Sequence, residues 1–146
     1  MGNAKDFLKK DKKERLSEYD PLEPQRIVNG VKGHLIKKKG DKDTHTNLPL
    51  YSNTSDVYLR QNEHGVVQAR VYVGQKTFLD FDWSHNHTNP NGESFPRGVV
   101  HVQIWQLNSE GIPERVGDAA RYMNNAEMKM YGPLLKAYNP GVKFRK

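Results

Sequence analysis

Leu79-Asp-Phe-Asp-Trp-Ser-His-Asn-His87 decides the fold, together with the segment Phe95-Pro-Arg-Gly-Val-Val-His-Val-Gln-Ile104. Apolar and polar residues alternate in both segments, and this period of two is typical of β-strands that bury one face. If the two strands pair antiparallel, the register that places Asp82 beside His101 also brings Trp83 against the apolar residues of the partner strand. One register therefore collects the apolar side chains on one face and the acidic and histidine side chains on the other. We expect the polar face to be exposed and free for function.

The alternation continues upstream of this pair. Residues 57–60 and 67–73 have the same period, and the turn at residues 62–65 is of a kind that closes hairpins. The pattern predicts a four-stranded antiparallel meander over residues 56–106, in a domain of the α+β class. A sheet with one apolar face needs a second element to cover that face.

A C-terminal helix is the predicted cover. Residues 118–131 have helical spacing, with Asp118 as the N-cap and with an apolar stripe made of Ala119, Met123, Ala126 and Met130. We expect Gly132-Pro133 to interrupt this helix. Its apolar stripe is predicted to pack on the sheet face formed by Leu79, Phe81 and Trp83.

The N-terminal quarter of the chain has a different character. Residues 5–15 mix positive and negative charges with few apolar anchors, and Pro21 and Pro24 end any helix there. Residues 1–25 are therefore predicted to form a charged helical arm or linker. Residues 26–146 are predicted to form a single α+β domain.

Composition limits the class of protein. The 146 residues contain no cysteine, so disulfides and thiolate metal sites are excluded. The mean hydropathy is −0.89, and the sequence contains no signal peptide and no membrane-spanning apolar run. We therefore expect a cytoplasmic protein without a membrane partner, which is compatible with delivery as part of a larger system. The net charge of +6 favours an anionic partner such as RNA. The oligomeric state is not determined by the sequence.

The candidate chemistry lies on the polar face. A histidine that is oriented by a carboxylate can act as a general base near neutral pH. The pattern suggests metal-independent RNA cleavage, with His101 as the base oriented by Asp82 and with His85 or His87 as the acid. The phosphate would be held by Arg97 or Arg70, and the residues expected to add RNA contacts are Tyr72, Lys37, Lys38 and Lys39.

Two other functions remain open. Asp82, His85, His87 and His101 also form a set that suits zinc or iron, and their order partly follows the two motifs of cupins. However, the Asn- and Gly-rich loop between them offers no visible support for a rigid site, so we expect no cofactor and no tightly bound native metal. The second alternative is an accessory protein, phage-associated or nucleic-acid-binding, that carries out no chemistry.

The chain also resembles a known group of nucleases. An acidic-aromatic strand, a His-rich loop and a His-Val strand resemble small C-terminal modules of bacterial polymorphic toxins and of phage head-morphogenesis proteins. These belong to the barnase–EndoU–colicin–RelE-like RNase group. The resemblance covers roughly residues 26–107 and depends on Asp80, Asp82, His85, His87 and His101. It implies a metal-independent endoribonuclease that acts on RNA and is paired with an immunity protein.

Overall fold

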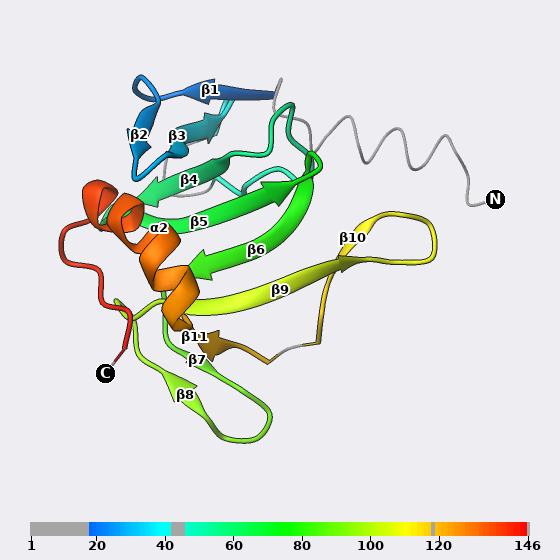
Figure 1. The fold of residues 1–146 in the computed structure, drawn as a ribbon, viewed down its shortest axis with the longest axis vertical. Helices are drawn as coiled ribbons and strands as arrows, with labels where there is room; N and C mark the ends of the chain where they lie inside the picture. Colours follow the sequence, from blue (N-terminus) through cyan, green and yellow to red (C-terminus); the bar gives the residue numbers. More distant parts are fainter. Residues whose placement is uncertain (1–17, 42–45, 118, 146) are drawn as a thin grey trace.

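A mixed β-sheet with one C-terminal helix forms the protein, and the α+β class is thereby confirmed (Figure 1). The computed structural model describes residues 18–41, 46–117 and 119–145. The elements in this part of the chain are β1 (Tyr19–Pro21), β2 (Arg26–Val28), β3 (Val31–Lys38), β4 (Val57–Asn62), β5 (Gly65–Val73), β6 (Lys76–Asp82), β7 (His87–Thr88), β8 (Ser94–Phe95), β9 (His101–Leu107), β10 (Pro113–Arg115), β11 (Arg121–Tyr122) and α2 (Asn125–Tyr138).

The prediction of a four-stranded meander is wrong, because the sheet has nine strands in the described residues. Strands β4, β5, β6 and β9 do pair antiparallel in that order. However, β3 adds to β4 in parallel, β1 and β2 pair with β3, and β10 and β11 pair with β9. The sheet is therefore mixed and extends beyond the predicted strands on both sides.

Gly33 lies in β3, a strand that the predicted four-stranded meander over residues 56–106 did not include. Glycine weakens a strand pattern in sequence. In the structure, a Cβ atom at residue 33 would lie 2.9 Å from side-chain atoms of both Leu134 and Tyr138. The helix therefore packs directly on the backbone of β3, which only glycine allows at this distance.

The predicted register of the central pair is confirmed. Asp82 lies opposite His101 and Phe81 lies opposite Val102. Trp83 is 3% exposed and belongs to the main hydrophobic core, which also contains Leu134 of α2. Figure 1 shows α2 crossing in front of one end of β5, β6 and β9, so the helix covers the predicted face.

The boundaries of the helix differ from the prediction. Residue 118 lies outside the described residues, and α2 begins after Asn124, whose side chain forms a reciprocal capping box with Glu127. Proline inside a helix leaves the carbonyl four residues earlier without its N–H partner. Asn29 Nδ2 donates to that carbonyl, on Lys129, at 3.1 Å, and the helix continues through Pro133.

The buried face of the helix is consequently not the predicted stripe. Met123 is buried, but the rest of the stripe is exposed at Ala119, Ala126 and Met130. The buried residues of α2 are Glu127, Gly132, Leu134, Leu135 and Tyr138. Ala119 and Met123 precede the helix, and Ala126 and Met130 lie on its exposed side.

The expectation of an exposed polar face is also wrong. Asp80 is 2% exposed and accepts two hydrogen bonds from Arg70, at 2.6 and 3.0 Å. Trp105 Nε1 also donates to Asp80, and Arg70 Nη1 donates to the carbonyl of Leu48. A second small core lies on this side of the sheet and contains Tyr19, Ile36, Leu48, Tyr58 and Tyr72. Much of the polar face is thus a satisfied, buried network.

Residues 1–17 of the predicted arm lie outside the described residues. The described remainder contains β1, which pairs with β3, and no N-terminal helix is seen in the part of the chain that the structure describes. None of the helical segments described has the length and apolar character needed to cross a membrane.

Candidate functional site

Three histidines meet where β6 ends and β9 begins. His101 is the first residue of β9, His87 is the first residue of β7, and His85 lies in the connection between β6 and β7. The short β7–β8 hairpin folds the chain back so that His87 lies opposite Phe95. The loop that was expected to be a flexible connection is therefore an ordered part of the site.

The three imidazole rings lie close together. Ring centroids are separated by 5.1 Å for His87 and His101, by 5.5 Å for His85 and His101, and by 6.3 Å for His85 and His87. Each ring offers one nitrogen to the cluster, and these nitrogens all lie within 4.8 Å of one another. We call this group of three residues the histidine cluster.

The neighbours of His85 determine the tautomer of its neutral ring. Ser84 Oγ donates to Asp82 Oδ1 at 2.7 Å, because an ionised carboxylate can only accept. The same hydroxyl lies 2.8 Å from His85 Nδ1, and since its only hydrogen is already used, it accepts from Nδ1–H. The neutral His85 ring therefore carries its lone pair on Nε2.

Asn89 determines the tautomer of the neutral His87 ring in a similar way. The Asn89 side chain is oriented by Ala120, whose N–H donates to Oδ1 at 2.8 Å and whose carbonyl accepts from Nδ2 at 2.8 Å. Oδ1 lies 3.0 Å from His87 Nε2, so that nitrogen is the donor. In the neutral ring of His87, the lone pair that can coordinate a metal lies on Nδ1.

His101 forms the buried side of the cluster. It is 1% exposed, and its ring centroid lies 5.8 Å from that of the buried ring of Phe95. Burial lowers the pKa of His101 to about 4, against the attraction of Asp82, while His85 and His87 lower it further. The imidazole is therefore neutral at neutral pH. Its Nδ1 atom is buried without a hydrogen-bond partner in the described part of the chain.

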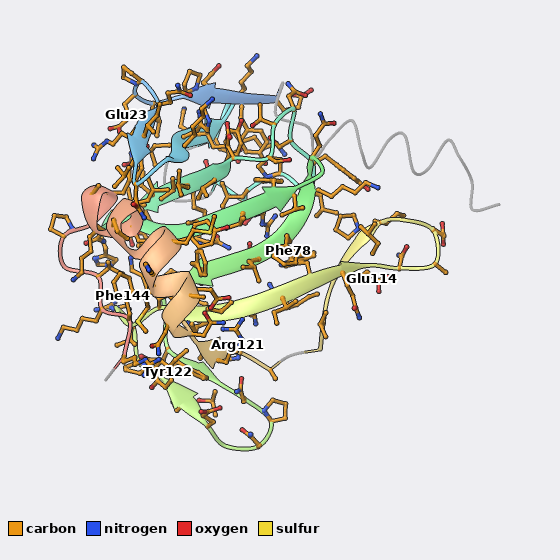
Figure 2. The ribbon with its side chains drawn as sticks, viewed as in Figure 1. Glu23, Phe78, Glu114, Arg121, Tyr122 and Phe144 are labelled. Atoms are coloured by element: carbon orange, nitrogen blue, oxygen red, sulfur yellow. The ribbon has the colours of Figure 1, made fainter. Side chains whose placement is uncertain are left out.

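The first turn of α2 supports the wall of the site. Tyr122, in β11, pairs with His101 across the sheet, and its ring contacts Phe95 at 4.7 Å. The adjacent Arg121 makes two hydrogen bonds to Glu127, at 2.7 and 2.8 Å. Figure 2 shows Arg121 and Tyr122 at the end of the sheet beside the start of the helix.

Only some of the predicted site residues lie close together in the structure. Asp82, His85, His87 and His101 meet, as described. Arg97 is exposed in the same loop, where its backbone N–H donates to Asn86. Arg70 is 7% exposed and paired with Asp80, and Tyr72 is 1% exposed with its hydroxyl bonded to Pro49.

The basic residues Lys37, Lys38 and Lys39 lie at the end of β3. Three strands separate β3 from β9 in the sheet, so these lysines do not line the histidine cluster. Lys37 Nζ donates to the carbonyl of Asp41. Their predicted contact with phosphate is therefore separate from any chemistry at His101.

Two supporting residues, Ser84 and Asn89, were missed from sequence. Asn89 stands in an Asn/Pro/Gly segment that is typical of a loop, and only its long-range contact with Ala120 reveals its role. Ser84 could have been found from the sequence, because it directly precedes His85 and follows Asp82 by two residues.

We compared the chain with protein-family models, with curated proteins and with solved structures, and none of them matches it. The geometry of the site is therefore the basis on which a function can be proposed.

Proposed function

We propose that the protein binds a divalent transition-metal ion of the zinc class through His85, His87 and His101. The observation that carries this proposal is the convergence of three imidazole nitrogens within 4.8 Å of one another, and neighbouring groups fix the tautomer of two of these rings, those of His85 and His87. Metal-binding histidines almost always donate their second ring nitrogen to such a neighbour. This replaces our expectation from sequence that no metal is bound.

The surroundings of the cluster suit an ion. Metal ligands must be deprotonated, and His101 is neutral at neutral pH because it is buried. Nitrogens around a tetrahedral ion with bonds near 2.0–2.1 Å lie about 3.4 Å apart, so binding requires nitrogens now up to 4.8 Å apart to approach by as much as about 1.4 Å. The side chain of His85 is 57% exposed and has the room to make this movement.

Three protein ligands leave a coordination position open. Structural zinc sites use four protein ligands, whereas catalytic sites use three and a water molecule. Because His85 is exposed while His101 is buried, we expect the open position to face solvent. A water molecule there would be activated for hydrolysis, which is the reaction class that we propose for the loaded protein.

Metal-independent RNA cleavage is less well supported by the geometry. A general base must come within hydrogen-bond distance of the hydroxyl that it deprotonates, and His101 is 1% exposed. Arg70, a predicted phosphate clamp, is held by Asp80 in the interior. We therefore propose that His101 holds a metal ion rather than removes a proton from RNA.

The test is a zinc titration of untagged protein that has been stripped with a chelator. We expect one zinc ion per chain in calorimetry, and we expect His85→Ala to weaken binding by at least tenfold. His64→Ala is the matched control, because His64 is an exposed histidine outside the cluster and its loss should leave zinc binding unchanged.

The proposal would be contradicted if the wild-type protein bound no zinc. It would also be contradicted if His85→Ala and His64→Ala weakened zinc binding equally. Labelled RNA incubated with the stripped protein and a chelator tests the alternative. Cleavage under those conditions would favour the acid–base mechanism predicted from the sequence.

A further inference from the structure

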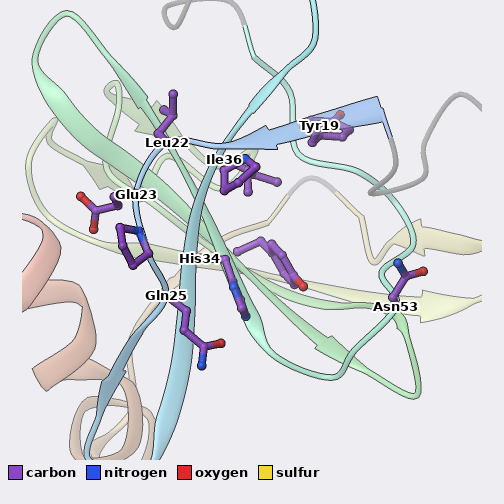
Figure 3. Close-up of a pocket in the computed structure, with 10 residues that line it drawn as sticks. Tyr19, Leu22, Glu23, Gln25, His34, Ile36 and Asn53 are labelled. Carbon is purple, nitrogen blue, oxygen red and sulfur yellow. The ribbon is translucent and has the colours of Figure 1, made fainter.

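A cavity lined by ten described residues lies away from the histidine cluster. It has a volume of about 560 Å³ and lies beside β3, under the connection between β1 and β2. Small-molecule sites commonly have volumes of this size. Figure 3 shows His34 near the middle of the lining residues, which are Tyr19, Pro21, Leu22, Glu23, Pro24, Gln25, His34, Ile36, Asn53 and Tyr58.

The inner wall of this cavity is aromatic and rigid. His34 stacks on Tyr58 with a centroid distance of 4.5 Å and an interplanar angle of 16°. The His34 ring is held in place because its Nε2 lies 2.9 Å from Asp56 Oδ2. Behind it, Tyr58 makes an edge contact with Tyr72 at 5.4 Å. A flat ring system fixed from behind is a stacking platform for a second flat ring.

The rim of the cavity carries hydrogen-bonding groups that are uncharged. Gln25 and Asn53 are both exposed, and each presents a side-chain amide with a donor and an acceptor. The carboxylate of Glu23 is already engaged by Arg26 at 2.7 Å. Lysine and arginine are absent from the ten described lining residues, so the cavity offers no cation for a phosphate.

We infer that this cavity binds an uncharged, planar heteroaromatic ring with donor and acceptor groups on its edge, which is the chemistry of a nucleobase. Aromatic side chains stack on bases, and Gln and Asn amides pair with base edges. The volume has room for a base and its sugar. The base could belong to a free nucleoside or to a single strand, and of these two only the strand carries phosphates that the net charge of +6 would attract.

The test uses saturation-transfer NMR on the full chain with adenosine and uridine, and with ribose 5-phosphate as the probe that lacks a base. We expect saturation of the base protons with at least one nucleoside and none with ribose 5-phosphate. Removal of one stacking partner should weaken binding by about fivefold to a hundredfold, so His34→Ala should do so. Gln25→Ala should reduce the difference in affinity between the two nucleosides.

His64→Ala is the control and should bind like the wild type, since His64 is exposed elsewhere. Backbone amide shifts of the wild-type protein provide a readout that needs no variant, and we expect them at residues 19, 20, 22, 23, 25, 34 and 53, since the prolines between them have no amide proton. The inference is overturned if neither nucleoside binds at millimolar concentration, if ribose 5-phosphate binds equally well, or if the shifts lie only around the histidine cluster.

A single-stranded hexanucleotide distinguishes the two sources. Affinity above that of the nucleoside, falling steeply with salt, would assign the base to a strand. Equal affinity would assign it to a free nucleoside. Both results support the base-binding cavity, which does not depend on the proposed metal site.

Discussion

Asn89 Oδ1 accepts a hydrogen bond from His87 Nε2 at 3.0 Å, and this contact determines which nitrogen of His87 can bind a metal. The Asn89 amide is 4% exposed and is itself oriented by the backbone of Ala120. A residue in the β7–β8 hairpin is thus tied to the segment that leads into β11. Mutation of a residue that supports a metal ligand in this way typically costs about 10- to 100-fold in metal affinity.

We predict that Asn89→Ala lowers zinc affinity by about tenfold to a hundredfold, because the His87 ring loses its orienting acceptor. Asn89→Asp keeps an acceptor at that position and should retain more of the affinity. Calorimetric titration of the two variants provides the measurement, with melting curves to show that both are folded. Equal affinities in Asn89→Ala and the wild type would contradict this role.

The metal-free protein should lose stability in weak acid. In the unfolded chain His101 has its ordinary pKa of 6.5, whereas burial lowers the pKa to about 4 in the folded protein. Between these values the unfolded chain binds more protons, so the free energy of unfolding falls as the pH decreases. The slope is at most about 1.4 kcal/mol per pH unit for one proton. The charged and titratable neighbours of this ring are Asp82, His85 and His87.

Urea denaturation between pH 7 and pH 4.5 measures this slope. Burial raises the pKa of Glu127, but the hydrogen bonds from Arg121 and from the backbone of Asn124 lower it overall, so this carboxylate adds to the slope only at the acid end of the window. His101→Gln should flatten the profile and His64→Ala should not. A flat wild-type profile would show that His101 is not shielded as the structure indicates.

Gly33→Ala should destabilise the protein by about 1–3 kcal/mol, which is the usual cost of overpacking. The new methyl group would lie 2.9 Å from side-chain atoms of Leu134 and Tyr138, so the helix would have to move away from β3. Gly141→Ala is the matched control, because the nearest atom there is 3.5 Å away. Equal melting temperatures for the two variants would argue against the direct packing of α2 on β3.

Arg70→Ala should cost about 3–5 kcal/mol, because it leaves the buried carboxylate of Asp80 without its partner. Arg97→Ala, at an exposed position, should change stability by less than about 0.5 kcal/mol. Chemical denaturation of both variants checks this difference. A small effect at Arg70 would restore it as a candidate for contact with RNA.

The central register could be predicted in part from the alternation, because a slip of one residue would turn Phe81 and Trp83 out of the core. The burial of the opposite face could not be predicted. Its cover comes from Leu48 and Pro49, whose carbonyls accept hydrogen bonds from Arg70, and no local pattern connects these distant residues. The polar residues on that face therefore predicted an exposed surface, although in the structure they are buried and hydrogen-bonded.

The helix shows the same limit. Pro133 predicts an interruption by its local chemistry, but Asn29 supplies the donor that the proline removes, from a position 100 residues away from Lys129. In the site, the meeting of His85, His87 and His101 could be anticipated from the strand pairing. The contacts that fix the tautomers of these rings could not be anticipated, with the exception of Ser84 beside His85. Asn89, which orients His87, is itself held by a residue 31 positions away in the sequence.

The most direct test of the central claim is a crystal structure of the protein soaked in zinc, with anomalous data collected at the zinc absorption edge. We predict one strong anomalous peak about 2.0–2.1 Å from a nitrogen of each of His85, His87 and His101. The absence of a peak among these three rings, or a peak elsewhere that lacks His101, would contradict the account.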